Sequence, residues 1–497
     1  MSETTETTEH LNEEEVRLQK CNQLREQSIE PYAYNYNPTH RMADIAPKYE
    51  TLDIGEHSED PICVAGRIIA KRGHGKATFG NLLDQDGTVQ YYANLSTLEE
   101  TNFNILLSLD VGDIIGVTGH MFRSKRGELT LFMESFQLLT KALLPLPEKH
   151  HGLTDKELRY RMRYVDLISN PEVRQVFQTR SKVVHAIRAF LHDRSFMEVE
   201  TPVLQSIFGG ASARPFNTFH NELQQDLFLR IALELHQKRL VVGGFERVFE
   251  IGRVFRNEGI SWKHNPEYTL LELYQAYADY DDIMALTEAL ISAVVYEQFG
   301  SYTIEYQGQS LNFEAPFDRI TMDDALLKYA GISMNAELDA LADCAKKLGL
   351  ELPETLHRGE LVNLIYDKVV EPNLIQPTFM MDYPWETSPL AKRKRDNPDL
   401  VERFELVVNK MEIANAYTEL NDPIDQQKRF EDQLKAKEAG FEETHEMDLD
   451  YVRALKYGLP PTGGLGIGID RLVMLLTDSA SIRDVICFPH MREVKED

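Results

Sequence analysis

Alternating apolar and polar residues between Glu246 and Tyr280 predict two β-strands joined by a polar loop. In the first strand, apolar side chains recur with period two on one face: Phe249, Ile251 and Phe255. In the second strand, Leu271 and Leu273 share one face, and the other face carries Tyr268, Leu270, Glu272 and Tyr274. The loop between the strands carries four polar side chains: Glu258, Lys263, His264 and Asn265. We expect the chemistry of the protein to lie on this hairpin.

Two charged residues would be costly in a purely structural hairpin. Arg256 ends an apolar strand and Glu272 lies within the run Leu-Leu-Glu-Leu, where a buried carboxylate must be paired or take up a proton. One interpretation is that Arg256 and Glu272 pair with each other across the hairpin. The other is that Arg256 and the loop form a phosphate and purine site, since arginine binds phosphate through a bidentate fork. Glu272 is then free to bind another positive group.

Short strand-like runs separated by glycine-containing turns occupy residues 61–140. The five runs cover residues 64–72, 77–84, 88–95, 113–122 and 128–139. Five strands of this length are typical of a small closed barrel of the OB type. Basic residues cluster on it, and Phe79 and Gln90 lie close to the first cluster, which contains Lys71 and Arg72. Such a surface can stack nucleic-acid bases in a basic groove, but barrel aromatics also form cores, and the sequence leaves both interpretations open.

Other patterns predict the elements around these regions. Residues 11–27 can form a helix, and Ser181–Arg194 has apolar residues at helical spacing. Residues 196–204 predict a strand that Pro202 breaks or confines to a sheet edge. Residues 145–155 are rich in proline and histidine and predict a linker. The region from Met322 to about Glu371 is helical, with little that suggests chemistry, and we interpret it as an insertion.

Residues 404–420 predict a second hairpin that turns at Asn409-Lys410. In that register Glu405 and Glu412 lie diagonally on one face, about 7–8 Å apart at the backbone. Two carboxylates so placed can share divalent cations that also bind phosphate oxygens. Unrelated acidic residues also occur on hairpins, so this pattern alone does not decide between a metal site and a solvated surface.

Glycines occupy alternate positions of the run GGLGIGIDRL, residues 463–472, which leads into a helix. The run is neither a dinucleotide-binding fingerprint nor a Walker-type loop, because the required glycine and lysine positions are missing. Gly464, Gly466 and Gly468 leave one face of the strand bare, so a flat ligand can lie against it. Arg471, on the following helix, would then reach the phosphates of the ligand or stack on its base.

Length and composition limit the classes of protein that fit. A chain of 497 residues exceeds one core, so we expect two or three domains. Its net charge of −27 argues against nucleic acid, although a local basic surface can coexist with an acidic whole. Four widely spaced cysteines (Cys21, Cys63, Cys344 and Cys487) predict neither a zinc site nor a disulfide framework. The acidic N-terminus is unlike a secretory signal and no run reaches membrane-spanning length, so we expect a cytoplasmic protein without membrane partners.

Several segments together resemble the class II aminoacyl-tRNA synthetases, and among them the lysyl-tRNA synthetase family. FRNEG…HNPEYT resembles motif 2 of that class, GGLGIGIDRL resembles motif 3, and FMEVETPVL resembles motif 1 with its proline at Pro202. The likeness to the lysine family rests on GGASARPF, RVFRNEGIS, LLELYQAYADY and ELND. The resemblance covers residues from about Pro61 to the C-terminus.

The resemblance implies an α/β multidomain fold. We expect an acidic tail and helical extension over residues 1–60, an OB-fold anticodon-binding domain over 61–144 and a linker over 145–160. Residues 161–497 are expected to form a class II catalytic domain, built on an antiparallel sheet flanked by helices, with the helical insertion at about 322–371.

The resemblance also implies roles for individual residues. Arg256 and Arg471 are the expected catalytic residues, in contact with the phosphates of ATP from two sides, and Arg256 also with the amino-acid carboxylate. ATP would further be bound by Glu258, His264, Asn265 and Tyr268. L-lysine would be bound at its α-amino group by Gly210 and Glu234, and at its side chain by Glu272, Tyr274, Asn415, Tyr417 and Glu419. Glu405 and Glu412 would hold more than one magnesium ion, with no zinc. The anticodon of tRNA(Lys) would contact Arg72, Phe79, Gln90 and Glu128. A homodimer is also expected.

The charge of the side-chain pocket favours lysine. Synthetases of the same group that activate aspartate or asparagine need cationic or amide partners there, whereas Glu272 and Glu419 present negative charge that suits an ε-ammonium group. In a regular strand, Glu412 and Asn415 would face opposite ways, yet the resemblance assigns both to one site. We therefore predict a β-bulge or strong twist near Ala414.

The reaction that the resemblance implies has two steps. The lysine carboxylate attacks the α-phosphorus of ATP to give lysyl-adenylate and pyrophosphate, and the terminal ribose hydroxyl of tRNA, expected to be the 3′-OH, then attacks the adenylate carbonyl. Two alternatives stay open. One is a relative that transfers lysine to a protein, a class that lacks the anticodon barrel. The other is an inactive paralogue kept for RNA binding or regulation, which would be expected to lose Arg256, Arg471, Glu405 or Glu412; all four are present.

Overall fold

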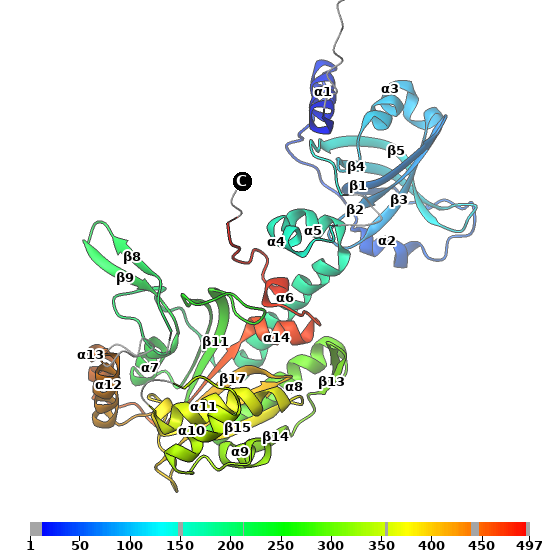
Figure 1. Cartoon of the computed structure of the whole chain (residues 1–497). Coiled ribbons are helices and arrows are strands. Elements are labelled where there is room, and N and C mark those ends of the chain that lie inside the picture. Colours follow the sequence, from blue (N-terminus) through cyan, green and yellow to red (C-terminus); the bar gives the residue numbers. More distant parts are fainter. Residues whose placement is uncertain (1–11, 148–152, 212, 353–355, 439–446, 494–497) are drawn as a thin grey trace, which may run out of the picture. The chain divides into compact units, whose positions relative to one another are not determined.

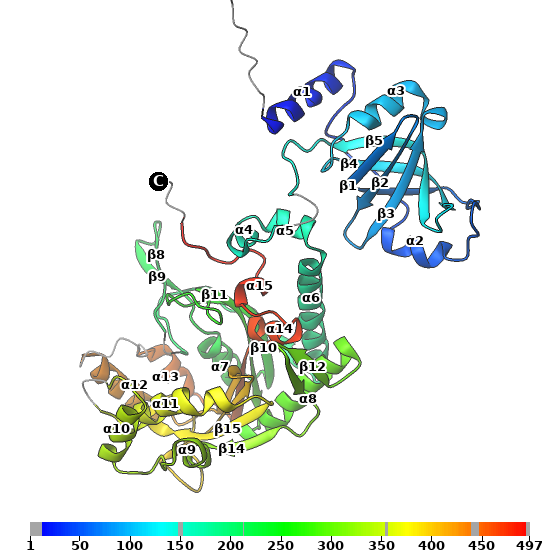
Figure 2. The ribbon, with the colours of Figure 1, turned by 45° about the vertical axis from the view of Figure 1, so that its right-hand side comes forward.

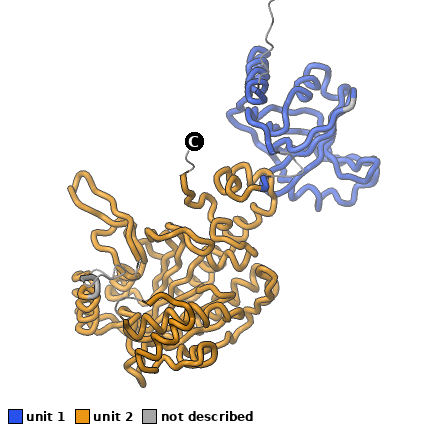
Figure 3. Tube along the Cα trace, viewed as in Figure 1, with its two compact units in different colours: residues 1–154 blue, residues 155–497 orange. Residues whose placement is uncertain are grey.

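A computed structural model of the chain describes residues 12–147, 153–211, 213–352, 356–438 and 447–493. Residues 1–11 of the predicted acidic tail and helical extension and residues 148–152 of the predicted linker lie outside this range. The chain forms two compact units, residues 1–154 and 155–497 (Figure 3). The division falls within the predicted linker, and the first helix of the second unit, α4 (Lys156–Arg161), begins directly after it.

The first unit contains the five-stranded closed barrel that the turn pattern predicts, with strand order β1-β2-β3-β5-β4 (Figure 1). The strands are β1 (Ile62–His74), β2 (Ala77–Leu83), β3 (Thr88–Asn94), β4 (Ile114–Arg123) and β5 (Leu129–Thr140), and helix α3 (Leu95–Ser108) connects β3 to β4. Alternate residues point inward and are fully buried, among them Ile62, Val64 and Ile68 of β1. Burial of this apolar set is the main force that closes the barrel.

The helical extension belongs to the same unit as the barrel. Leu24 of α1 (Glu13–Glu26) and Met42 and Ile45 of α2 (Met42–Tyr49) are buried in the barrel's hydrophobic cluster.

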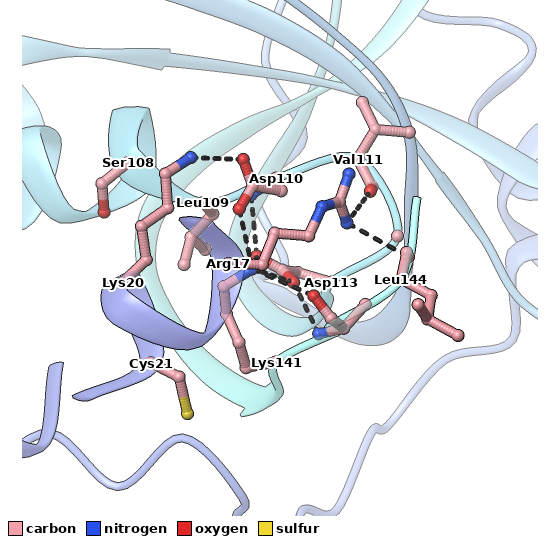
Figure 4. Close-up of polar contacts among 12 residues, drawn as sticks. Arg17, Lys20, Cys21, Ser108, Leu109, Asp110, Val111, Asp113, Lys141 and Leu144 are labelled. Carbon is pink, nitrogen blue, oxygen red and sulfur yellow. Dashed lines mark hydrogen bonds and ion pairs between the residues drawn. The ribbon is translucent and has the colours of Figure 1, made fainter. Parts of the chain in front are cut away.

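Polar contacts fix α1 as well (Figure 4). Arg17 donates to the Val111 carbonyl at 3.0 Å, and Lys20 pairs with Asp110. Fully buried Lys141 bridges Asp110 and Asp113 at 2.8 and 2.9 Å. The basic groups of this helix thus hold the extension to its own unit.

The second unit is built on an eight-stranded sheet of order β14-β15-β16-β17-β18-β11-β10-β6 (Figures 1 and 2). All neighbouring strands are antiparallel except the outer pairs β14/β15 and β10/β6. The strands are β6 (Met197–Glu198), β10 (Arg247–Phe255), β11 (Glu267–Ala276), β14 (Asp318–Thr321), β15 (Thr378–Pro384), β16 (Leu400–Val408), β17 (Met411–Thr418) and β18 (Thr462–Gly468). This arrangement confirms the predicted antiparallel sheet.

Helices cover one face of the central strands of the sheet, and the opposite face of these strands carries the site. Leu271, Leu273 and Ile467 of the central strands are buried against α6 (Pro171–His192), α8 (Tyr280–Phe299) and α14 (Ile469–Leu476) in one hydrophobic cluster. Because successive side chains of a strand alternate between faces, Leu270, Glu272 and Tyr274 point to the opposite side.

The remaining elements surround this framework. They are α5 (Arg163–Ser169), β7 (Leu204–Gln205), β8 (Asn217–His220), β9 (Gln225–Leu229), α7 (Glu234–Val242), β12 (Thr303–Tyr306), β13 (Gln309–Asn312), α9 (Met322–Ala330), α10 (Leu338–Lys347), α11 (Arg358–Val369), α12 (Pro423–Glu438), α13 (Leu449–Leu455) and α15 (Ile482–Val485). Within the predicted insertion, α9, α10 and α11 gather beside β14 and β15 (Figures 1 and 2). The single strand expected over 196–204 is divided into β6 and β7, which lie in different sheets, as the break at Pro202 predicts.

Candidate active site

The open face of the sheet forms the floor of a cavity of about 1100 Å³. It is lined by every residue predicted to bind lysine or ATP and by one of the two predicted metal ligands: Gly210, Glu234, Arg256, Glu258, His264, Asn265, Tyr268, Glu272, Tyr274, Glu412, Asn415, Tyr417, Glu419 and Arg471. Glu405 does not line the cavity, although it lies next to residues that do. Residues more than 200 positions apart in the chain therefore meet at one place.

Arg256 follows β10, at the edge of the polar loop. Its backbone N–H donates to the Pro266 carbonyl at 2.8 Å, and its guanidinium lies 5.5 Å from the ring centre of Tyr268. Burial lowers the pKa of Arg256, but Tyr268 and Glu258 more than offset this, so that the net pKa is raised and the group stays charged. No ion pair among the described residues joins Arg256 to Glu272, so the direct pairing considered from the sequence is not what the structure contains.

Glu272 is held by hydrogen bonds from neutral groups. It is only 6% exposed, and it accepts hydrogen bonds from the Leu233 N–H and the Tyr274 hydroxyl, each at 3.1 Å. Burial, with a further contribution from Glu234, raises the pKa of Glu272 to about 8. A carboxyl group in this state gains most from a bound cation, because the cation offsets the cost of its ionisation.

Lys238 of α7 does not line the cavity but lies directly behind two of its carboxylates, and the sequence did not single it out. Its ammonium group is fully buried and forms ion pairs with both Glu234 and Glu419. Glu234 also accepts a hydrogen bond from the Tyr417 hydroxyl at 2.8 Å. The only local signal for this residue is the i, i+4 spacing of Glu234 and Lys238 on one helix.

The β16/β17 hairpin contains the predicted bulge. Val407 pairs with Glu412 and Leu406 pairs with Ala414, so Ile413 is the extra residue. This insertion brings Glu412 and Asn415 to the same side of the sheet, where both line the cavity. The bulge prediction is confirmed.

Each of the two predicted metal ligands accepts a hydrogen bond from an arginine. Arg403 donates to Glu405 at 2.6 Å and to the side-chain oxygen of Asn415 at 3.1 Å. Arg471 donates to the Glu412 carboxylate at 3.2 Å and to its backbone carbonyl at 2.9 Å. Burial raises the pKa of Glu405 to about 7; Arg403 opposes this rise and Glu412 adds to it.

The polar loop places two neutral groups at the cavity. Burial, together with Arg471 and Lys263, lowers the pKa of His264 to about 4, so its imidazole is uncharged at neutral pH. One of its ring nitrogens lies 2.8 Å from the Ser261 hydroxyl. Buried Asn265 donates to the Glu267 carbonyl at 2.6 Å, and among the described contacts its side-chain oxygen has no partner. Both groups can recognise a polar, uncharged ring such as a purine.

The glycines of β18 and at its end leave room in two different ways. A Cβ atom at Gly464 would lie 2.0 Å from a carboxylate oxygen of Glu419, so a side chain there would displace that residue. A Cβ at Gly466 or Gly468 would meet nothing closer than 3.8 Å, so these positions open onto the cavity. The strand thus provides room for Glu419 at one end and a flat surface at the other.

The insertion also contributes to the cavity, contrary to its description from sequence as carrying little chemistry. One face of α11 and the residue before it line the cavity with His357, Glu360, Asn363, Leu364 and Asp367. Beyond the helix, Glu371 pairs with Lys263 of the polar loop at 3.0 Å. The helical spacing of these residues is a signal in the sequence, but only the fold shows which way that face points.

The predicted anticodon residues lie on one surface of the barrel. Arg72 pairs in register with Phe79, which is 36% exposed, and Gln90 donates to Glu128 at 3.0 Å. Phe79 belongs to a cluster of aromatic rings whose other members were not singled out from the sequence: His57, Tyr92, Phe122 and Phe132. Lys71, by contrast, donates to three backbone carbonyls near the end of α3 and is not available to a ligand.

Two further properties concern metals and membranes. Among the described residues, no group of three or more histidine, cysteine, aspartate or glutamate side chains is placed to hold a metal ion. In the part of the chain that the structure covers, each helix is too short or too polar to cross a membrane.

Residues 155–492 match the family described as class II tRNA synthetases for aspartate, lysine and asparagine, and residues 62–139 match the OB-fold nucleic acid binding domain. Curated relatives are similar over nearly the whole chain. The chain is 54% identical to a lysine–tRNA ligase of Thermoanaerobacter sp. (strain X514), over 98% of its own length and 97% of the relative's. It is also 54% identical to the lysine–tRNA ligase of Carboxydothermus hydrogenoformans, over 97% of its own length and 99% of the relative's. The chain is 51% identical to the lysine–tRNA ligase of Trichormus variabilis, over 97% of its own length and 88% of the relative's.

Proposed function

The chain belongs to the lysine–tRNA ligase family of class II tRNA synthetases, and on that premise we propose which of its residues bind each substrate. Its activity is the ATP-dependent ligation of lysine to tRNA. The comparisons give no support to a protein-modifying relative or to an inactive paralogue. The observation that carries the residue assignment is that one cavity is lined both by Arg256 and by three buried carboxylates, Glu234, Glu272 and Glu419.

Lysine occupies the end of the cavity that contains Glu234, Glu272 and Glu419. Glu234 and the backbone at Gly210 bind the α-amino group, and Arg256 binds the carboxylate. Glu272 and Glu419 bind the ε-ammonium group, supported by Tyr274, Asn415 and Tyr417. A bound ammonium favours the ionised form of Glu272, whose raised pKa otherwise holds it partly protonated.

ATP lies between Arg256 and Arg471, against Gly466 and Gly468 of β18. Arg256 binds the α-phosphate, and Arg471 meets the triphosphate and the adenine from the other side. Glu258, His264, Asn265 and Tyr268 place the nucleotide, and the neutral imidazole of His264 avoids adding charge beside the base. The lysine carboxylate then attacks the α-phosphorus in line, the bond to the β-phosphate oxygen breaks, and pyrophosphate leaves with its electron pair. Positioning and charge neutralisation drive the step, without a protein nucleophile.

Glu405 and Glu412 would hold magnesium. Their carboxylate oxygens are the donors that this ion prefers, and the raised pKa of Glu405 shows that nearby Arg403 alone does not neutralise the pair. Bound magnesium would neutralise phosphate charge. We propose more than one ion per site, because the substrate's own phosphates add further oxygen donors.

The barrel binds the tRNA anticodon through Phe79, Arg72, Gln90 and Glu128. Partly exposed Phe79 packs 4.7 Å from the ring of Tyr92, an arrangement that suits stacking of an unpaired base. The terminal ribose of tRNA(Lys), at its 3′-OH, then attacks the carbonyl of the lysyl-adenylate, and AMP is released.

Two copies of the chain form a homodimer through the segment after α6. Met197 of β6, the strand at one end of the large sheet, is 40% exposed, and Val203 and Leu204, where the chain enters β7 of another sheet, are 39% and 48% exposed. Apolar groups at an open sheet edge are what a second copy would cover. We place the protein in the cytoplasm, where tRNA is charged; the four cysteines are free, as expected for a reducing compartment.

Lysine-dependent ATP–pyrophosphate exchange without tRNA tests the residue assignment. The wild-type chain should exchange with lysine, and Arg256→Met should lose about 100-fold or more in kcat/KM, because it removes a charge-neutralising contact. Phe79→Ala should exchange like the wild type yet charge tRNA poorly. Equal exchange by the wild type and Arg256→Met would contradict the assignment of the cavity.

A further inference from the structure

A fixed positive charge lies directly behind the carboxylates of the proposed lysine pocket, without lining the cavity itself. The Lys238 ammonium contacts one oxygen of Glu234 and one oxygen of Glu419, and its side chain has no exposed surface. Three aromatic rings enclose it with centres 5.5–5.9 Å away: Tyr274, Tyr417 and Tyr451. Neither of the two catalytic steps described above uses this group.

The charges of the pocket match a substrate with two cations. When all three are ionised, as beside a bound cation, Glu234, Glu272 and Glu419 provide three negative charges; Lys238 provides one positive charge, which leaves an excess of two negative charges. Lysine provides two ammonium groups, and its carboxylate is bound separately by Arg256. Without Lys238 the excess would be three, and a buried charge without a partner is strongly unfavourable.

Lys238 also determines which carboxylate oxygens are available. It contacts Oε1 of Glu234 and Oε2 of Glu419, while Tyr417 donates to Oε2 of Glu234 at 2.8 Å. Oε1 of Glu419 faces Gly464, where the absence of a side chain leaves it room. One cation therefore links the carboxylate for the α-amino group to a carboxylate for the ε-ammonium group.

We propose that Lys238 is a positioning residue that fixes Glu234 and Glu419 relative to each other and gives the pocket its selectivity for a dication. The proposal rests on the proposed assignment of this pocket to lysine. It adds a specificity determinant on α7 to those on β11 and β17.

The electrostatic surroundings of Glu419 support this role. Burial raises the pKa of Glu419 well above its ordinary value, and Lys238 is the group that opposes the rise. The charged and titratable groups that face it come from four elements: Glu234 and Lys238 of α7, Glu272 and Tyr274 of β11, Tyr417 of β17, and Tyr451 of α13. Loss of Lys238 therefore favours the protonated form of Glu419, which binds an ammonium group poorly. That loss should be partly reversed at higher pH.

The test is lysine-dependent pyrophosphate exchange by Lys238→Met across about pH 6.5 to 9. We expect KM for lysine to rise about 30-fold or more at neutral pH with a smaller change in kcat, and the pH at which kcat/KM rises to move upward. Arg239→Met is the matched control: it removes the next cation of the same helix, which pairs with Asp448 and Asp450 and not with a carboxylate of the lysine pocket. It should keep the wild-type KM and pH profile.

The double variant Lys238→Met/Glu419→Gln separates positioning from a general structural effect, and it removes both charges of one buried pair. If Lys238 acts through Glu419, the fold-loss of kcat/KM in the double variant should be smaller than the product of the two single fold-losses, by about tenfold or more. A multiplicative loss would overturn the proposal, as would a Lys238→Met enzyme with lysine KM and pH profile within about threefold of wild type. Absence of lysine-dependent exchange in the wild type would instead overturn the assignment of the pocket itself.

Discussion

Replacement of Glu272 by glutamine tests the electrostatic basis of lysine binding. The amide keeps the size of the side chain and can still accept the hydrogen bond from the Leu233 N–H. It loses the negative charge that the ε-ammonium group is proposed to meet. Loss of one partner of a buried charge pair costs about 2–5 kcal/mol, and about 3.5 kcal/mol corresponds to a loss of about 300-fold in kcat/KM for lysine.

The size of this loss should depend on pH. Burial raises the pKa of Glu272 to about 8, so at neutral pH the free wild-type enzyme must first ionise the group. That ionisation costs about 1.4 kcal/mol at pH 7, which reduces the wild-type advantage to about 30-fold. At about pH 8.5 the carboxyl group is mostly ionised, and the advantage should approach about 300-fold.

The assay is ATP–pyrophosphate exchange with lysine as the varied substrate, at both pH values. Glu250→Gln is a suitable control, because Glu250 lies directly opposite Glu272 in the hairpin but pairs with Arg230. It should leave the pH dependence of lysine use unchanged. A ratio of wild type to Glu272→Gln that is the same at both pH values would refute the role given to the raised pKa. A ratio close to one would refute the role of Glu272 altogether.

Three further outcomes are expected. Glu272→Gln should unfold at a higher temperature than the wild type at pH 8 but at nearly the same temperature at pH 4.5: a raised pKa in the folded chain means that stability falls as pH rises from 4.5 to about 8. Thermal unfolding checks this, and an equal difference at both pH values would contradict it. Gly464→Ala should raise KM for lysine about tenfold or more, since its Cβ would displace Glu419, whereas Gly466→Ala meets only contacts of 3.8 Å and should leave that KM nearly unchanged. Phe79→Ala should lower kcat/KM for tRNA about 10- to 100-fold, without effect on pyrophosphate exchange.

Local rules in the sequence predicted much of the fold around the site. Period-two patterns and turn residues located both hairpins, and the alternation along β11 separated the core residues Leu271 and Leu273 from Glu272. The bulge at Ile413 was predictable because two residues assigned to one site, Glu412 and Asn415, have the wrong spacing for a regular strand. These features depend on neighbours in sequence or on one strand partner.

Features that depend on packing between distant elements were not predictable. Lys238 joins Glu419 only because α7 packs against the strands that carry the pocket, and a lone lysine on a helix gives no such signal. The face of α11 that lines the cavity resembles any solvated helix surface until the insertion is placed. Likewise, Lys71 on the barrel looked like a nucleic-acid contact but caps the end of a helix.

Aminoacylation of a complete tRNA set with labelled lysine decides whether the chain charges tRNA and whether the proposed pocket selects lysine. Lysine should be attached to tRNA(Lys) alone, at the terminal ribose, and Glu272→Gln should lower kcat/KM for lysine strongly. Formation of lysyl-adenylate without any charged tRNA would contradict the proposed pairing of barrel and anticodon. Equal charging by the wild type and Glu272→Gln would contradict the proposed lysine pocket.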